Sequence, residues 1–204
     1  MAGSGGAIYV AIRIAAPIET VWALTQDPQN HARWDARFSR IEPLDDLPGG
    51  GSRFRYERAL PGHLIHGLGT AIGERRRPDG SRTSALRFET ADRLSPLRSG
   101  RGYWRYLPDG DGTLFITGYD YLPGWGRVLD ALGIRRLVGW LTAWSFDRLR
   151  IWAETGEPPE RWPLRSVLLV WRRNRPRAAR CARRSPDRDV FAAAPATLAT
   201  LEHP

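Results

Sequence analysis

The sequence predicts an α+β fold in two layers, in which a meandering antiparallel sheet is covered by one long helix. Residues 8–14 alternate bulky apolar side chains with smaller or polar ones, and six further strand-like runs follow between residues 37 and 122. An amphipathic helical pattern then runs from residue 134 to residue 153. A period of two marks a strand with one buried face, whereas a period of 3.6 marks a helix. One helix against one apolar sheet face gives two layers.

Two short helices are expected directly after the first strand, 8–14. Pro17 ends that strand and suits the first turn of a helix. The dipeptide Asp27-Pro28 restarts the chain as a second helix, with Asp27 as its N-cap and an end near Trp34.

A run of six strands follows, separated by turns rich in proline and glycine. One face of these strands is aromatic and aliphatic, with Phe54, Tyr56, Phe88 and Trp104, and the other face is charged. The final run is apolar on both faces, so its register stays open. The expected strands are 37–45, 51–60, 63–76, 81–91, 97–107 and 113–122.

A second helical region covers residues 124–155 and is broken near Gly133. Its part from residue 134 to residue 153 spans about 30 Å at 1.5 Å per residue, enough to cross a whole sheet. Gly156 and the prolines after it end the helix. We therefore expect a domain over residues 1–156 and an extension over residues 157–204.

The composition is strongly basic, with 31 arginines, no lysine and a net charge of +9. Codon bias best explains the missing lysine, and the alternative is recognition of phosphate or carboxylate groups by guanidinium side chains. Residues 161–204 carry +7 and residues 1–160 only +2, which argues against a nucleic-acid-binding domain. The single cysteine, Cys181, excludes an internal disulfide framework. Without a signal peptide or an apolar run of about 20 residues, a cytoplasmic location is expected.

The extension holds nine arginines and no acidic residue between Arg161 and Pro186. We expect a short helix over about 162–174 and a disordered tail over 187–204. Three interpretations stay open for the basic stretch: contact with an anionic membrane surface, contact with nucleic acid, or a solvated segment packed on the domain. The arginines around Cys181 would favour its thiolate if that side chain is exposed.

The start of the chain combines a strand that leads into Ala16-Pro17 with the pairs Val21-Trp22 and Asp27-Pro28 and with Trp34-Asp35. In these features the chain resembles the START-like SRPBCC superfamily, and the resemblance covers about residues 8–155. The order of elements is similar to the helix-grip fold of that superfamily, a seven-stranded curved antiparallel sheet wrapped around a long C-terminal helix. The resemblance implies a deep cavity for a hydrophobic or amphipathic ligand. The superfamily includes polyketide aromatase/cyclases, lipid carriers, ring-hydroxylase subunits and regulators, so fold alone does not select a function.

We expect the protein to bind a hydrophobic or polyaromatic small molecule, lipid or polyketide-like, as a carrier or a polyketide cyclase/dehydratase-like protein. The alternative is an interaction or regulatory protein that uses the domain as a scaffold and the arginine-rich tail to bind an anionic membrane or nucleic acid. The aromatic candidates can equally be plain core. Arg58 and His66 share strand faces with apolar residues, so each either meets a ligand carboxylate or phenolate or lies in solvent at a strand end. The expected ligand-binding residues are Tyr56, Arg58, His66, Phe88, Trp104, Tyr119, Tyr121 and Trp144.

No sequence pattern points to a metal or a cofactor. His63 and His66 fall on opposite faces of a strand, and no zinc-protease, P-loop or nucleophile-elbow motif occurs. His31 is expected on the surface. If the protein is an enzyme, a polyketide cyclase, aromatase or dehydratase without metal fits best, because orienting the ligand and supplying a Tyr, Arg or His for enolisation can suffice. The pattern carries no signal for oligomeric state.

Overall fold

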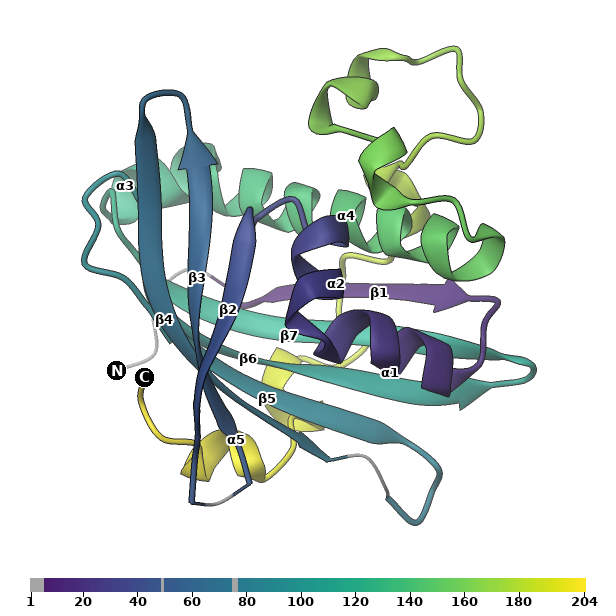
Figure 1. Ribbon diagram of the computed structural model, residues 1–204, viewed down its shortest axis with the longest axis horizontal. Helices are drawn as coiled ribbons and strands as arrows, with labels where there is room; N and C mark the ends of the chain where they lie inside the picture. Colours follow the sequence, from purple (N-terminus) through teal and green to yellow (C-terminus); the bar gives the residue numbers. More distant parts are fainter. Residues whose placement is uncertain (1–5, 49, 75–76) are drawn as a thin grey trace.

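The computed structural model describes residues 6–48, 50–74 and 77–204. Seven antiparallel strands form one curved sheet, and a long helix lies across one of its faces (Figure 1). The strand order is β1-β7-β6-β5-β4-β3-β2, so β1 and β2 are the edges. This arrangement confirms the predicted α+β helix-grip architecture. The strands are β1 (Ile8–Ile14), β2 (Arg40–Asp46), β3 (Ser52–Leu60), β4 (His63–Glu74), β5 (Arg82–Glu89), β6 (Leu97–Asp109) and β7 (Gly112–Pro123).

Two short helices, α1 (Ile18–Gln26) and α2 (Pro28–Trp34), connect β1 to β2. The Asp27 side chain accepts a hydrogen bond from the Gln29 backbone N–H at 2.8 Å, which caps α2 as the sequence predicts. The second helical region consists of α3 (Arg127–Leu129), a π-helical turn η1 (Asp130–Ile134) and α4 (Arg135–Thr155). The expected break near Gly133 is this π turn. Gly156 ends α4 in the left-handed conformation with φ 72°.

The core lies between the inner face of the sheet and α4. The rings of Phe115 and Phe146 stack with centroids 4.5 Å apart, and Tyr106 stacks on Phe115 at 4.9 Å. Trp34 and Trp144 are fully buried beside them. The register of β7 follows from this packing, because Phe115 and every second residue after it point to the inner face.

The prediction of a helix over about 162–174 is wrong. The structure has a 3₁₀ helix η3 (Leu164–Leu168) followed by turns. Short helices are marginal in water unless an apolar face is buried, and here Leu168, Val170 and Trp171 are exposed. The repeated arginines of the segment also repel one another.

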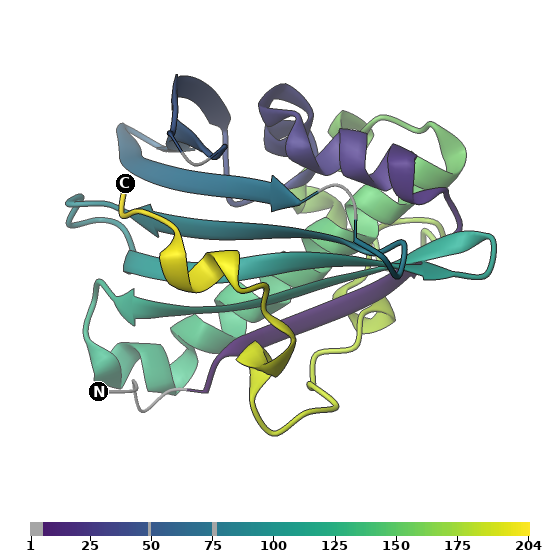
Figure 2. The ribbon, with the colours of Figure 1, turned by 90° about the horizontal axis from the view of Figure 1, so that it is seen from below.

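The prediction of a disordered tail over 187–204 is likewise wrong. A 3₁₀ helix η5 (Val190–Ala193) and the short α5 (Thr197–Thr200) cross the face of the sheet opposite to α4 (Figure 2). Leu198 and Leu201 are buried there against Ala85 and Tyr103. The Tyr103 hydroxyl donates to the Val190 carbonyl at 2.7 Å. The tail is ordered because it covers an apolar patch on the outer face of the sheet.

Cys181 is buried. The nearby arginines were expected to favour its thiolate only if the side chain is exposed, so that expectation does not apply. The Cys181 thiol donates to the Ala143 carbonyl on α4 at 3.2 Å, and burial raises its pKa to about 12. The next residue, Ala182, exchanges two backbone hydrogen bonds of 2.9 Å with Ala11 on the edge strand β1. This part of the extension therefore belongs to the packed body of the protein. The division into a domain and an extension at residue 156 stays a prediction.

Asp147 on α4 connects the extension to the helix. Its side chain is fully buried and accepts hydrogen bonds from Arg150 Nε at 2.6 Å, the Arg177 backbone N–H at 2.7 Å and Arg180 Nη1 at 2.7 Å. Because a buried charge pair is costly to break, Asp147→Ala should lower the free energy of unfolding by about 3 kcal/mol in urea titrations. Asp111→Ala, which removes a 90% exposed partner of Arg13, should change it little. Equal losses in the two variants would contradict this role of Asp147.

Candidate functional site

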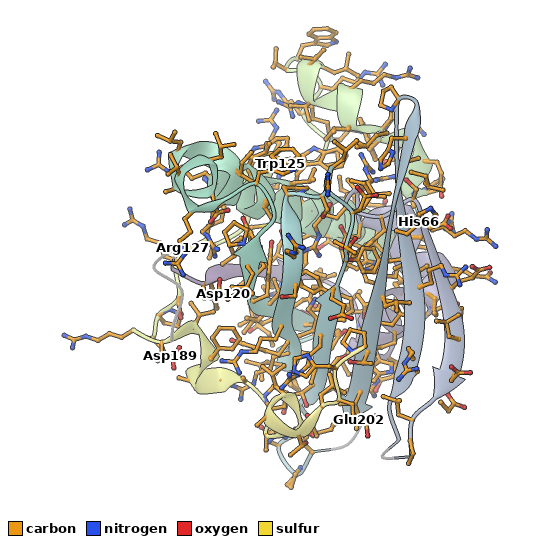
Figure 3. All side chains as sticks on the ribbon, turned by 90° about the vertical axis from the view of Figure 1, so that its left-hand side faces the viewer. His66, Asp120, Trp125, Arg127, Asp189 and Glu202 are labelled. Atoms are coloured by element: carbon orange, nitrogen blue, oxygen red, sulfur yellow. The ribbon has the colours of Figure 1, made fainter. Side chains whose placement is uncertain are left out.

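A cavity of about 410 Å³ lies between the inner face of the sheet, the first half of α4 and the segment after α2. Its size falls within the range of about 300–1,000 Å³ that is typical of small-molecule sites. Leu94 and Trp125, both partly exposed, lie at its mouth. Trp125 stands just before the start of α3 (Figure 3). The wall is mostly apolar and includes Phe38, Phe54, Tyr56, Leu60, Ile65, Leu86, Phe88, Leu97, Trp104, Val138 and Leu141.

Glycines on the inner face make room for this cavity. Gly67 and Gly69 of β4 pair with Tyr56 and Phe54 of β3, whose rings lie over them. A Cβ atom at Gly67 would come within 2.1 Å of the Tyr56 ring, and one at Gly69 within 2.3 Å of the Phe54 ring. The rings therefore lie flat along the sheet, where a side chain on β4 would otherwise lift them into the cavity.

Five of the eight predicted site residues line the cavity. They come from β3, β5, β6 and β7, which the antiparallel sheet brings around one cavity. Arg58 points inward and donates from Nη1 to the Ala36 carbonyl at 2.6 Å. The Tyr56 hydroxyl donates to the Glu89 carbonyl at 3.3 Å. The five are Tyr56, Arg58, Phe88, Trp104 and Tyr119.

The other three predicted residues lie elsewhere. His66 is on the outer face of β4, half-exposed, with Nδ1 3.6 Å from a carboxylate oxygen of Glu57 (Figure 3). Leu64, His66 and Leu68 alternate as an inner face would, but they lie on the outer face, and the inner positions are taken by Ile65, Gly67 and Gly69. Tyr121 is on the inner face, but its hydroxyl donates to Asp130 at 2.5 Å and the residue is not part of the cavity wall. Trp144, a residue of α4, is fully buried in the core.

A charged cluster that the sequence analysis missed forms the polar end of the cavity. Asp35 is fully buried and accepts from Arg37 Nη2 at 2.6 Å and Arg37 Nε at 2.9 Å. His31 Nε2 lies 3.3 Å from the second carboxylate oxygen. Both His31 and Arg37 belong to the cavity wall, and the Arg37 guanidinium lies 5.4 Å from the centre of the Tyr119 ring.

The expectation that His31 is on the surface is wrong. Its ring stacks on Trp34 at 5.0 Å and meets the edges of Phe38 and Trp104. The i,i+4 spacing of His31 and Asp35 at the end of a helix is a signal in the sequence that could have indicated this pair.

Burial and charge oppose each other within the cluster. Burial alone would raise the Asp35 pKa, but the charge of Arg37 and the hydrogen bonds from His31 and Arg37 outweigh it and hold that pKa well below its ordinary value. Burial dominates at His31 and lowers its pKa. Asp35 is therefore ionised and His31 neutral near pH 7. With its Nε2–H directed at the carboxylate, the neutral His31 ring keeps Nδ1 as an acceptor.

The hydroxyl of Tyr119 also has a defined direction. Thr142 on α4 donates its single hydroxyl hydrogen to the Val138 carbonyl at 2.9 Å. The 2.7 Å bond between the two hydroxyls must then be donated by Tyr119. The oxygen of Tyr119 is left as an acceptor near the Arg37 guanidinium.

These features define the class of protein, a START-like SRPBCC domain with a helix-grip fold and a cavity suited to a hydrophobic ligand. The chain belongs to the family described as "Polyketide cyclase / dehydrase and lipid transport", which matches residues 6–154.

A relative in Bacillus subtilis (strain 168), named "Uncharacterized membrane protein YndG", is 37% identical over 169 residues. The match covers 80% of this chain and 63% of the relative, so the chain spans less than two thirds of the length of that protein. Within the described parts of the chain, none of the helices combines the length and the apolar character needed to cross a bilayer.

Two solved structures show the same fold. The Zhui aromatase/cyclase from Streptomyces sp. R1128 superposes with a TM-score of 0.53 at 15% identity, covering 74% of this chain and 97% of that one. The STAR-related lipid transfer protein from Xanthomonas axonopodis gives a TM-score of 0.52 at 17% identity, covering 73% and 88%. At these identities the likeness concerns the fold alone.

The buried histidine makes stability depend on pH. Because the pKa of folded His31 lies below its unfolded value near 6.5, the unfolded chain binds a proton first as the pH falls. The free energy of unfolding should therefore decrease from about pH 7 to about pH 5. The depressed Asp35 pKa adds its own loss only at lower pH, below its unfolded value. His31→Gln should show a flatter dependence in urea titrations across this window, and curves that run parallel would contradict the assignment.

Proposed function

We propose that this protein binds a hydrophobic or polyaromatic small molecule, of lipid or polyketide type, in the cavity between the sheet and α4. The observation that carries the proposal is a largely apolar cavity of about 410 Å³ with one polar end. Apolar walls supply affinity through burial, and a few placed polar groups fix orientation. The family description, which names polyketide cyclases and lipid transport together, supports the same ligand class.

The polar end sets the chemistry of the matching ligand group. It combines donors on Arg37 with acceptors on Tyr119 and His31. The charge of Arg37 is neutralised by Asp35, so a carboxylate gains little there, whereas a hydroxyl or carbonyl oxygen is satisfied. We infer a ligand whose apolar body fills the cavity and whose hydroxyl or keto oxygen meets this cluster. Arg58, which also lines the cavity, suits a second polar or anionic group.

The role of a carrier fits this site best, because it requires binding of the ligand but no reactive side chain. Asp35 is fully engaged with Arg37 and His31, so it holds them in place rather than reacting. A cyclase or dehydratase would need His31 to accept a proton from the ligand through Nδ1.

The cytoplasmic location stays a prediction.

Filling the cavity should weaken ligand binding. Leu86 lines the cavity, whereas Leu68 on β4 points to the outer face and is partly exposed. Leu86→Trp should lower the affinity for the uncharged polyaromatic probe N-phenyl-1-naphthylamine by about tenfold or more, since overlap removes buried contact. Leu68→Trp adds the same side chain outside the cavity and should bind the probe like the wild type. Fluorescence titration checks both, and equal affinities for the two variants, or no saturable binding by the wild type, would contradict the proposal.

The Tyr119 hydroxyl should distinguish oxygenated ligands from hydrocarbons. Tyr119→Phe keeps the ring and removes the acceptor, so 2-naphthol should bind about tenfold more weakly while naphthalene is little affected. Tyr121→Phe serves as the matched control, because its hydroxyl is engaged with Asp130 away from the cavity. Displacement of the fluorescent probe measures both ligands. A loss of similar size for naphthalene would mean that the hydroxyl acts through the fold and not through the ligand.

A further inference from the structure

The extension presents an unusual set of exposed apolar side chains over residues 164–173, here called the Trp171 segment. Leu168, Val170 and Trp171 are 75%, 65% and 72% exposed. They are held in hydrogen-bonded turns, because the Val170 N–H donates to the Leu168 carbonyl at 2.9 Å and the Arg172 N–H to the Leu169 carbonyl at 3.0 Å. Single exposed apolar residues are common on protein surfaces, but a contiguous cluster that includes tryptophan indicates a contact surface.

The charge around this segment has one sign. Arg165, Arg172 and Arg173 are exposed, and none of them pairs with an acidic residue in the part of the chain that the structure describes. The stretch from Arg161 to Pro186 contains no acidic residue at all. A surface that carries apolar and cationic side chains together is complementary to one that is apolar and anionic.

The body of the protein holds the Trp171 segment in place. Trp162 and Ser166 are buried at its start, and Arg180 donates to the carbonyls of Arg173 and Arg175 at 2.9 and 3.0 Å. Arg180 in turn is bound by Asp147 of α4. The apolar side chains are therefore presented with little ordering cost on binding.

A second exposed apolar cluster lies at the other end of α4. Val128 and Leu132, on α3 and the π turn, are 72% and 73% exposed and are accompanied by exposed Arg127 and Arg136. Asp130 between them is buried against Arg135 and Tyr121, so it adds no exposed negative charge. Figure 1 shows α3 and the Trp171 segment on the same side of the molecule, at opposite ends of α4.

We propose that this side of the molecule docks on the surface of an anionic phospholipid bilayer. Leu168, Val170 and Trp171 enter the boundary between headgroups and acyl chains, and the arginines contact lipid phosphates. Val128 and Leu132 touch the same surface next to the mouth of the cavity. Nucleic acid fits less well, because phosphates would leave the protruding apolar side chains in water. The proposal does not require that the cavity binds a ligand.

Vesicle sedimentation with the full chain tests the proposal. Vesicles of phosphatidylcholine with about 30% phosphatidylglycerol should bind the protein, and pure phosphatidylcholine vesicles should bind it at least tenfold more weakly. The triple variant Leu168→Ser, Val170→Ser, Trp171→Ser should lower binding to the anionic vesicles by about tenfold or more. Arg172→Gln with Arg173→Gln should lower it and flatten its salt dependence. Val128→Ser with Leu132→Ser should give a smaller loss.

A control removes apolar side chains away from the proposed docking side. Leu44 on β2 and Leu68 on β4 are exposed by about two fifths each, and their replacement by serine should leave vesicle binding unchanged. Each variant is compared with the wild type in thermal unfolding and in N-phenyl-1-naphthylamine binding, so that loss of docking is separated from loss of fold or of the cavity.

Fluorescence supplies a direct readout of insertion. Lipids brominated on the acyl chain should quench the wild type more than Trp171→Phe, since the other eight tryptophans are common to both. Equal quenching, or equal vesicle binding by the segment variant and its control, would overturn the proposal. Tighter binding to duplex DNA of equal phosphate concentration would also overturn it in favour of nucleic acid. A dimer that the segment variants convert to monomer, without vesicle binding by the wild type, would assign the surface to a second copy of the chain.

Discussion

The cavity depends on a packing constraint between neighbouring strands, the pairing of an aromatic residue with a glycine. Tyr56 lies over Gly67 and Phe54 over Gly69, and Phe88 in the same way lies over Gly100 of β6. Each ring occupies the space that a side chain on the next strand would need. The inner face is therefore aromatic without being filled, and a curved sheet can cover α4 while leaving a cavity of ligand size beside it.

This constraint explains which parts of the site could be predicted from the sequence. Alternation along β3, β5 and β6 correctly placed Tyr56, Phe88 and Trp104 on the inner face, since bulky apolar residues recur at every second position. The same criterion failed on β4, where glycines take two of the inner positions, Gly67 and Gly69, and leucines flank His66 on the outer face. A glycine in a strand signals close approach of another group, but which group it meets depends on the strand register, which the pattern does not contain.

The polar end of the cavity depends on contacts between segments that are far apart in the fold. Its charges come from the end of α2 and the residues after it, whereas Tyr119 comes from β7 and Thr142 from α4. Spacing could indicate the pair His31 and Asp35. It could not indicate that Trp34, Phe38 and Trp104 bury that pair, and burial is what keeps His31 neutral beside an ionised carboxylate.

The extension shows how composition can mislead about order. Its arginine content and its final run of alanine, proline and threonine are typical of solvated segments, yet Ala182 pairs with the edge strand β1 and Leu198 and Leu201 cover the outer face of the sheet. Covering an edge and an apolar patch offsets the entropy lost on ordering the chain. Once these parts are packed, the exposed apolar residues of the extension are concentrated in residues 164–173, beside arginines that have no acidic partner among the described residues. Exposed arginines of this segment, Arg165, Arg172 and Arg173, are thus displayed on an ordered surface, where charge and apolar area act together on one partner.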